Sequence, residues 1–235
     1  AEATEWLRLC QRLNAETPDW EKKNKLAVYE GMLALQGKDI ARAATLFLGC
    51  VNTFNAEEVL PFNAMVEYAV LLGMLTLPRK EVAEKIVDNS EVRAVLNDNH
   101  PLDGFLFALY RSRYDQYFPA LLAVVERLVR PDPRLRPLEP LLLGRARVTV
   151  YAQYLEAYRT VRLEKMARDF GVSAAFLDRE LAALIAARKL HCRIDLLAGT
   201  VESAPGNPRM ALVGQMLAKA DSLAERLSQL IASAQ

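Results

Sequence analysis

Residues 158–203 read YRTVRLEKMARDFGVSAAFLDRELAALIAARKLHCRIDLLAGTVES, and this stretch decides the fold of the later part of the chain. The apolar residues at its start lie mostly at helical spacing, namely Val161, Leu163, Met166, Ala167 and Phe170. Gly171 follows directly, where a left-handed C-terminal cap favours glycine. The pattern predicts a first helix that runs through these residues and ends at Phe170.

A second helix and a β-hairpin come next. Ser173 stands where an N-cap belongs, because its hydroxyl can accept a free backbone N–H, and apolar residues then repeat at steps of three and four. After Lys189 the period changes to two, which indicates a strand, and Ala198-Gly199 can form the turn of a hairpin. Helix, turn, helix and hairpin in this order predict a winged helix. Its wing consists of Leu190, His191, Cys192, Arg193, Ile194 and Asp195, with Thr200 and Val201 on the return strand.

The charges of this winged helix do not suit DNA. Base edges and phosphates are bound by Arg, Lys, Asn and Gln side chains. The second helix instead begins with Ala174, Ala175, Asp178 and Glu180 around Arg179, and the hairpin tip DLLAGTVES has two acids and no cation. With a formal net charge of only +1, the chain gains little from counterion release. We expect a protein partner and no nucleic acid.

Composition indicates an ordinary globular protein with a sizeable core. The 235 residues are 52% hydrophobic and 25% charged, and no apolar run reaches the roughly 18 residues of a membrane span. Cys10, Cys50 and Cys192 are odd in number, far apart and set among apolar neighbours. We interpret them as reduced core residues of an intracellular protein without a disulfide framework. No signal-peptide pattern is present, so the expected location is the cytoplasm or the nucleus.

The part before residue 158 is predicted to be helical nearly throughout. Asp39 can cap a helix whose apolar residues are unusually regular, namely Ile40, Ala43, Ala44, Phe47 and Val51. Four residues also occupy the small or aromatic positions of a tetratricopeptide repeat, namely Gly31, Ala43, Phe47 and Cys50. Ala27 and Ala34 stand where that repeat usually has Trp and Tyr, so the match is partial. Further on, six aromatic residues between Phe105 and Phe118 indicate core packing.

After the motif PGNP at residues 205–208, one more helix is predicted from about Arg209 to Ala232. Its apolar seam follows steps of three and four and consists of Val213, Met216, Ala220, Leu223, Leu227 and Leu230. Such a helix would be roughly 35 Å long, more than a winged helix needs for its own cover. Periodicity allows two interpretations: the helix folds back onto the preceding helices, or it enters a bundle with helices of other chains.

Motifs for catalysis are absent from the sequence. The two histidines, His100 and His191, are about ninety residues apart, and Cys or His pairs at zinc-binding spacing do not occur. HExxH, GxxxxGK[ST], GxGxxG and GxSxG are also missing. Carboxylate pairs such as Glu57-Glu58 are more simply explained as solvated helix faces. We therefore expect a protein without catalytic residues, cofactor, metal or small-molecule ligand.

A helical solenoid that runs directly into a winged helix resembles the PCI family, whose domain is shared by the proteasome lid, the COP9 signalosome and a translation initiation factor complex. The stretch MARDFGVSAAFLDRELAALIAARKLHCRIDLLAGTVES is similar to the winged-helix end of that module. LHCRID with TVES, DWEKKNKLAVYEGMLALQGKDIARAATLFLGCVNTF, FALYRSRYDQYF and YAQYLEAYRTV resemble a PCI subunit of the proteasome lid in particular.

This resemblance implies a scaffold. The predicted fold is mainly α: a right-handed, TPR-like helical solenoid over residues 1–157, the winged-helix part of the PCI domain over 158–204, and a C-terminal bundle helix over 205–235. The resemblance implies that the wing, from Leu190 to Asp195 with Thr200 and Val201, pairs edge to edge with other PCI subunits. It also implies that the seam from Val213 to Leu230 enters a helical bundle in the lid.

The implied partners are the PCI and MPN subunits of the lid and the ATPase ring, with no membrane contact. The implied role is a non-catalytic one in ubiquitin-dependent protein degradation. Two alternatives remain open at this point. One is the equivalent PCI subunit of the COP9 signalosome, and the other is a nucleic-acid-binding winged-helix protein.

Overall fold

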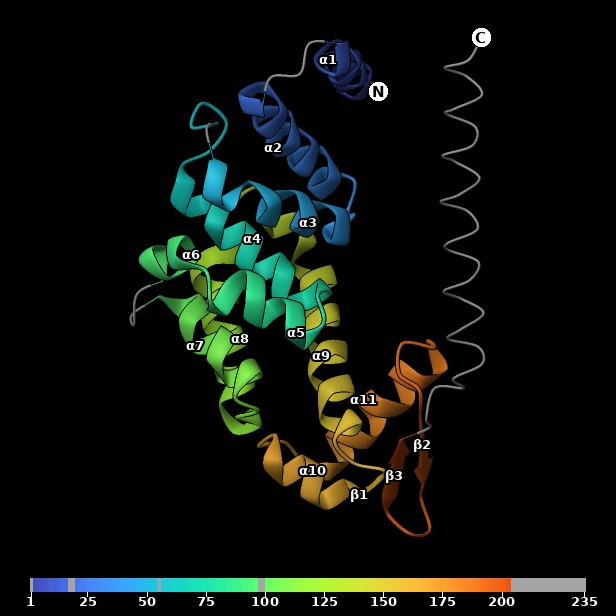
Figure 1. Cartoon of the computed structure of the whole chain (residues 1–235). Helices are drawn as coiled ribbons and strands as arrows, with labels where there is room; N and C mark the ends of the chain where they lie inside the picture. Colours follow the sequence, from blue (N-terminus) through green and yellow to red (C-terminus); the bar gives the residue numbers. More distant parts are fainter. Residues whose placement is uncertain (1, 17–19, 55, 97–99, 204–235) are drawn as a thin grey trace. The chain divides into compact units, whose positions relative to one another are not determined.

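The computed structural model describes residues 2–16, 20–54, 56–96 and 100–203 (Figure 1). These residues fall into two compact units. Among the described residues, the N-terminal unit contains those up to 151 together with 169–171, and the C-terminal unit contains 152–168 and 172–203. The predicted seam residues Val213, Met216, Ala220, Leu223, Leu227 and Leu230 lie outside the described part of the chain.

The N-terminal unit is built from helices. Its elements are α1 (Glu2–Glu16), α2 (Trp20–Gln36), α3 (Ile40–Cys50), η1 (Val51–Thr53), α4 (Phe62–Thr76), α5 (Arg79–Val82), η2 (Ala83–Val87), α6 (Ser90–Val95), α7 (Pro101–Tyr110), α8 (Tyr114–Val124), η3 (Val125–Val129) and η4 (Arg136–Leu138). The longer α9 (Glu139–Glu156) begins in this unit and ends in the next. In the described residues, no helix is long and apolar enough to cross a membrane.

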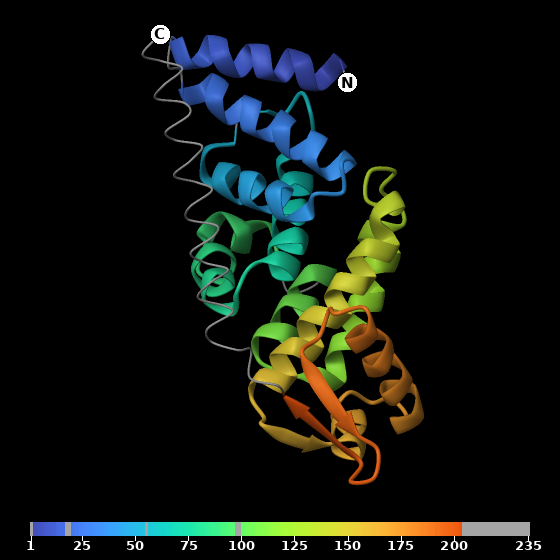
Figure 2. The ribbon, with the colours of Figure 1, turned by 90° about the vertical axis from the view of Figure 1, so that its right-hand side faces the viewer.

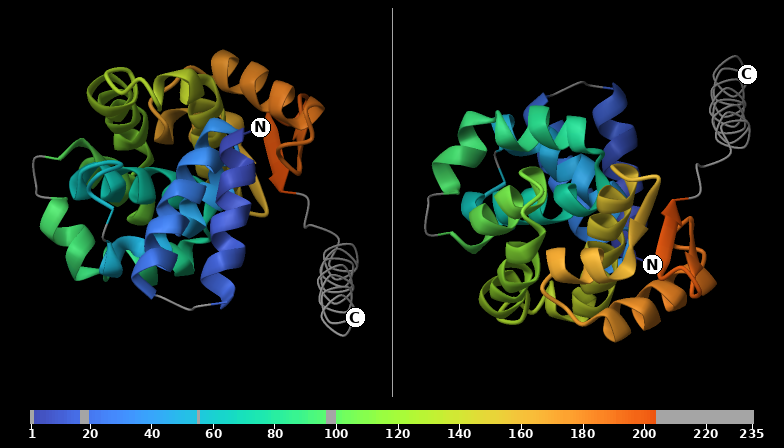
Figure 3. Two further views of the ribbon diagram at one scale, coloured as in Figure 1. Left: turned by 90° about the horizontal axis from the view of Figure 1, so that it is seen from above. Right: turned by 90° about the horizontal axis from the view of Figure 1, so that it is seen from below.

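The first helices stack one on another. Figure 2 shows α2 running back along α1 and α3 running back along α2, and the views in Figure 3 agree. The cap predicted at Asp39 is present, because its side chain accepts a hydrogen bond from the N–H of Arg42 at 3.1 Å. The regular apolar stripe of α3 and the start of η1 is buried as predicted, at Ile40, Ala43, Ala44, Phe47 and Val51. Through these residues α3 packs against both α2 and α4.

A close approach between α2 and α3 depends on a glycine. A Cβ atom placed on Gly31 would lie 2.7 Å from Cε1 of Phe47. The Phe47 ring is fully buried and lies 6.0 Å from the ring of Tyr68 on α4, centroid to centroid. The small residue at position 31 therefore lets a large aromatic ring fill the space between three helices.

The aromatic-rich segment forms part of the core, as its spacing predicted. Phe105 of α7 and Tyr117 of α8 are fully buried with ring centroids 5.0 Å apart. Phe170, which follows α10, joins the same cluster, with its ring 5.8 Å from Phe118 and 5.1 Å from Tyr151 of α9. The buried Tyr117 hydroxyl donates to the carbonyl oxygen of Ala146 at 2.9 Å, so its polar atom is satisfied inside this cluster.

The C-terminal unit contains strands as well as helices. Its elements are the end of α9, β1 (Thr160–Arg162), α10 (Leu163–Asp169), α11 (Ala174–Ala186), β2 (Cys192–Asp195) and β3 (Thr200–Ser203). The two predicted signals between the helices are confirmed. Gly171 has a φ of +65°, and the Ser173 hydroxyl accepts from the N–H of Phe176 at 3.3 Å.

Two expectations about this sequence were wrong. Val161 was assigned to the first helix, but residues 160–162 form β1 and the helix begins at Leu163. Val161 lies directly opposite Val201 of β3, about forty residues later, and a pairing at that separation leaves no local pattern. Cys10 was expected in the core, but its side chain is exposed on α1, whereas Cys50 and Cys192 are buried. The apolar neighbours of Cys10 in the sequence did not indicate burial, because the apolar residues of α1 (Trp6, Leu9 and Leu13) are themselves exposed.

The three strands form one antiparallel sheet in the order β1-β3-β2. One face carries an apolar row across all three strands, Val161, Val201 and Ile194. The opposite face carries the rows Thr160, Glu202, Arg193 and Arg162, Thr200, Asp195, each of which contains one acidic and one basic residue. The chain is thus mainly helical with a small antiparallel sheet.

Candidate interaction surfaces

The strand order places the predicted wing residues differently along the sheet. β2 lies at an edge, whereas β3 lies in the centre and pairs with β1 and β2. Thr200 and Val201 therefore already have a strand on each side. Cys192, Arg193, Ile194 and Asp195 belong to β2, and Leu190 and His191 precede it. Of the two predicted wing strands, β2 is the one that can present an outer edge.

The direction of the main-chain groups in β2 follows from one hydrogen bond of β3. In an antiparallel strand, the N–H and C=O of one residue point to the same side and those of the next residue to the other side. The N–H of Ser203 donates to the carbonyl oxygen of Arg159 at 3.0 Å, on the β1 side, so Glu202 is directed toward β2. Glu202 is paired with Arg193, whose main-chain groups are therefore used in the sheet.

The residues on either side of Arg193 consequently direct their main-chain groups away from β3. These residues are Cys192 and Ile194, which lie along the outer edge of β2. An edge with regularly spaced N–H and C=O groups can accept the strand of another chain. The recognition would come from the main chain, and it would depend little on the side chains of the edge.

Several of the predicted wing residues point their side chains into the protein. Leu190, Cys192 and Val201 are buried, Ile194 and Thr200 are partly buried, and His191, Arg193 and Asp195 are exposed. Burial raises the pKa of the Cys192 thiol, which keeps it protonated and a poor nucleophile at neutral pH. Their predicted role in interaction is therefore compatible with a main-chain contact at β2, while the buried side chains support the fold.

The start of α11 carries few cations, as expected from the sequence. Ala175 and Arg179 are exposed, and the Nε–H of Arg179 donates to the carbonyl oxygen of Ala175 at 3.1 Å. Asp178 and Glu180 are partly buried on the same helix. Phe176 is an exposed aromatic residue in the first turn. This surface offers one cation next to two acids, which does not match the charge of a nucleic-acid backbone.

Two leucines at the tip of the hairpin were not among the predicted interaction residues. Leu196 and Leu197 connect β2 to β3, and both side chains are exposed. The sequence feature that could have indicated them is the pair of adjacent leucines between Asp195 and the turn at Ala198-Gly199.

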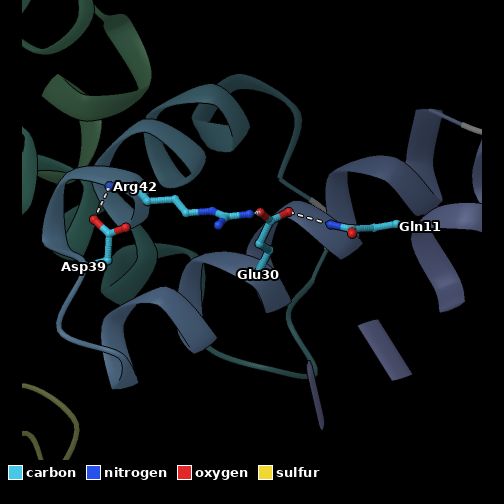
Figure 4. A network of polar contacts seen from close by, with 4 residues as sticks. All are labelled: Gln11, Glu30, Asp39 and Arg42. Carbon is cyan, nitrogen blue, oxygen red and sulfur yellow. Dashed lines mark hydrogen bonds and ion pairs between the residues drawn. The ribbon is translucent and has the colours of Figure 1, made fainter. Parts of the chain in front are cut away.

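A polar network joins three helices of the N-terminal unit and has a structural explanation. Glu30 of α2 accepts from the side-chain amide of Gln11 on α1 at 2.7 Å and forms an ion pair with Arg42 of α3 (Figure 4). Arg42 is in turn the residue whose N–H is held by Asp39. The Glu30 side chain is only 16% exposed, so its charge needs these partners. The network links α1 and α3 across α2.

Other titratable groups of the N-terminal unit also serve the fold. His100 accepts from the N–H of Leu102 through Nδ1 at 3.3 Å, which caps α7, and its Nε2 lies 3.1 Å from Oε1 of Glu67. This arrangement requires the neutral tautomer with hydrogen on Nε2. The Tyr68 hydroxyl donates to Asp132, and burial together with this carboxylate raises the pKa of Tyr68. Across the described ranges, no three His, Cys, Asp or Glu residues are grouped as metal ligands would be.

Known protein families match both the early and the late part of the chain. Residues 1–85 match the family model described as 26S proteasome subunit RPN7, and residues 122–204 match the PCI domain. The chain is 37% identical over 220 residues to the 26S proteasome non-ATPase regulatory subunit 6 homolog of Arabidopsis thaliana, covering 94% of this chain and 57% of that protein. It is 38% identical over 186 residues to the 26S proteasome regulatory subunit rpn7 of Schizosaccharomyces pombe, covering 78% of this chain and 47% of that protein.

A weaker similarity points to another complex. The chain is 28% identical over 186 residues to the COP9 signalosome complex subunit 1 of Arabidopsis thaliana, covering 77% of this chain and 42% of that protein. The chain spans about half the length of the curated relatives it matches. The higher identities and the match over residues 1–85 agree with the resemblance found in the sequence. The chain therefore belongs to the family of PCI-domain proteins that includes 26S proteasome subunit RPN7.

Proposed function

We propose that the chain is a non-catalytic scaffold subunit of the lid of the proteasome regulatory particle and supports ubiquitin-dependent protein degradation. One observation carries this proposal: relatives named as 26S proteasome subunits align with 94% of the chain, across both of its units. These relatives are named as regulatory non-ATPase subunits, which favours assembly over catalysis.

The proposed architecture follows the family. The N-terminal helices would form a right-handed, TPR-like solenoid, and the C-terminal unit would be the winged helix of the PCI domain. Consecutive packing of α1, α2, α3 and α4 supports the first assignment. The order β1, α10, α11, β2 and β3 supports the second. The proposed partners are PCI and MPN subunits of the lid, together with the ATPase ring, and the proposed location is the cytoplasm and the nucleus.

Two surfaces would serve assembly. The outer edge of β2, at Cys192 and Ile194, would pair with a strand of a neighbouring PCI subunit, since its main-chain groups point away from β3. The apolar seam from Val213 to Leu230 would enter the helical bundle of the lid, since its steps of three and four suit helix packing.

Affinity purification tests this proposal. The tagged chain is purified from its own cells, with and without residues 209–235, and the proteins that accompany it are quantified by mass spectrometry. We expect lid and ATPase subunits with the full chain and their loss from the shortened chain. A complete set of signalosome subunits would instead support the second candidate, which the similarity to COP9 signalosome complex subunit 1 favours.

The nucleic-acid alternative has a separate test. The purified chain is titrated with a fluorescent DNA duplex at low salt. Because α11 and the hairpin tip carry few cations, we expect no saturable binding. Tight binding that weakens steeply with added salt would contradict the scaffold assignment.

A further inference from the structure

β2 ends the sheet on one side, and its outer edge carries ordered main-chain groups. Cys192 and Ile194 direct their N–H and C=O groups away from β3, whereas those of Arg193 are used in the sheet. The strand contains neither a proline nor a bulge, two devices that commonly protect a sheet edge. An unprotected edge can pair with another strand, and the side chains of β2 then decide which strand fits.

Two opposite charges flank Ile194 on this strand. The Arg193 and Asp195 side chains are exposed on one face of the sheet, and Ile194 lies between them on the other face. Neither of the two charged residues forms an ion pair with another described residue. Asp195 accepts through Oδ1 from the N–H groups of Leu197 and Ala198 at 2.9 and 3.1 Å, which leaves Oδ2 for a cation. The edge thus presents a base, an apolar residue and an acid in this order.

This order is complementary to itself when the strand is turned around. In an antiparallel pair, residues opposite each other point to the same face, and hydrogen-bonded pairs alternate with pairs that are not hydrogen-bonded. If two copies of β2 pair about a two-fold axis at Ile194, the two isoleucines form a hydrogen-bonded pair, because both direct their main-chain groups outward. Each Arg193 then lies opposite Asp195 of the second copy. Two cross-strand pairs of opposite charge stabilise this register.

The other charges of the sheet agree with this register. Glu202 lies on the inner side of Arg193, so the polar face would carry Glu202, Arg193 and then Asp195 of the second copy in one row. On the inner side of Asp195 lies Thr200, with Arg162 beyond it on β1. Consequently, no two like charges would lie opposite each other on neighbouring strands of the joined sheet.

Other two-fold registers of the same edge fit less well. An axis at Arg193 would place two arginines opposite each other, which is destabilising. An axis at Cys192 would pair Arg193 with His191, which precedes the strand and offers no negative charge. The charges of β2 therefore favour the axis at Ile194.

We propose that a second copy of this chain pairs with β2, antiparallel and with the two-fold axis at Ile194, so that two three-stranded sheets join into one sheet. The pairing covers an edge that is otherwise open, and its contacts are self-complementary, as a symmetric dimer requires. The proposal goes beyond the scaffold function, because it concerns the chain before assembly. Since a strand of a neighbouring PCI subunit would use the same edge, the dimer and the lid contact exclude each other.

Sedimentation equilibrium of the purified full chain, over a wide range of protein concentration, tests for the dimer. We expect a monomer–dimer equilibrium that weakens as salt is added, because the pairs of Arg193 with Asp195 are exposed. Hydrogen exchange locates the contact. Protection of the Ile194 amide should rise with protein concentration, whereas the Arg193 amide is already used in the sheet and should change little. A chain that stays monomeric at every concentration would overturn the proposal.

Charge reversal tests the register. The first variant combines Arg193→Glu with Glu202→Lys, which keeps opposite charges in the β2–β3 pair but places an acid opposite Asp195 of the second copy. The second variant, Asp195→Lys, places a base opposite Arg193. Each should dimerise at least roughly tenfold more weakly than wild type, because two attractive pairs become repulsive. An equimolar mixture of the two variants should dimerise like wild type, because each acid then meets a base.

Two further variants control for effects on the fold. Arg162→Glu makes an equivalent change on the same face of the sheet but on β1, at the opposite edge, and should leave the dimer unchanged. Asp195→Asn keeps an oxygen acceptor for the turn while it removes the charge, so it should weaken the dimer and melt close to wild type. Equal dimer stability in all these variants would assign the dimer to another surface and overturn the proposal. None of these measurements uses lid subunits, so failure of the lid assignment would leave this proposal standing.

Discussion

Phe47 shows how single residues hold the N-terminal unit together. Its ring is fully buried between α2, α3 and α4 and is in contact with the position of Gly31. We expect Phe47→Ala to lower the free energy of unfolding by about 3–5 kcal/mol, since the surrounding helices cannot close the cavity completely. Urea denaturation followed by circular dichroism measures this change. A loss below about 1 kcal/mol would mean that the ring is not part of the core.

Gly31 provides a sharper test of the same contact. Gly31→Ala should destabilise the N-terminal unit by about 1–3 kcal/mol, because the new Cβ would lie 2.7 Å from a ring that has no room to move. Gly144→Ala in α9 is the matched control, since a Cβ there meets open space. This control should be neutral or stabilise the chain by about 0.5–1 kcal/mol, the usual gain of alanine over glycine in a helix.

A double substitution tests whether the Phe47 ring is the cause. In a Phe47→Leu background the smaller side chain leaves room for the new methyl group, so Gly31→Ala should cost less than in wild type. Denaturant midpoints of the four proteins give the interaction energy. Strict additivity of the two changes would assign the effect of Gly31→Ala to another cause.

At the scale of elements, β2 combines a buried side-chain face with an outer main-chain edge. Ile194→Pro removes the N–H that points outward, whereas Arg193→Pro removes one that bonds to β3. We expect Ile194→Pro to keep a cooperative thermal transition, with a smaller fall in melting temperature than Arg193→Pro causes, and to reduce incorporation into the lid. Arg193→Pro should lower the melting temperature, because it breaks the β2–β3 ladder.

The comparison of these adjacent prolines controls for the residue type itself. Melting is followed by circular dichroism, and incorporation by native gel electrophoresis of the assembled lid. If Ile194→Pro entered the lid at the wild-type level, the edge of β2 would have no role in assembly.

At the scale of the whole molecule, folding and assembly should depend on different segments. Leu223→Asp places a charge in the predicted seam of residues 213–230. We expect this variant to fold with a denaturation midpoint close to that of wild type and to lose incorporation into the lid, because a buried unpaired charge is strongly disfavoured in a helical bundle. A destabilisation as large as that of Phe47→Ala would show that the seam belongs to the core of this chain instead.

Local signals in the sequence predicted much of the chain correctly. Helix caps at Asp39 and Ser173 and the left-handed Gly171 depend on hydrogen bonds and φ angles within a few residues, so they can be inferred from neighbours in sequence. The regular stripe of α3 identified its buried face for the same reason. These short-range effects determined that the chain is mainly helical and where its late hairpin lies.

Long-range pairing decided the rest. Val161 belongs to a strand because Val201, forty residues later, lies opposite it, and the central place of β3 follows from the same pairing. Only this arrangement shows that β2, and not β3, is the hairpin strand with an outer edge, and that Leu196 and Leu197 are exposed at the end of the hairpin. Sequence by itself determined the helices and the β2–β3 hairpin, since their hydrogen bonds are local or periodic, but it did not reveal β1. Tertiary structure decided which edge and which side chains stay exposed, because exposure depends on contacts between residues far apart in the chain.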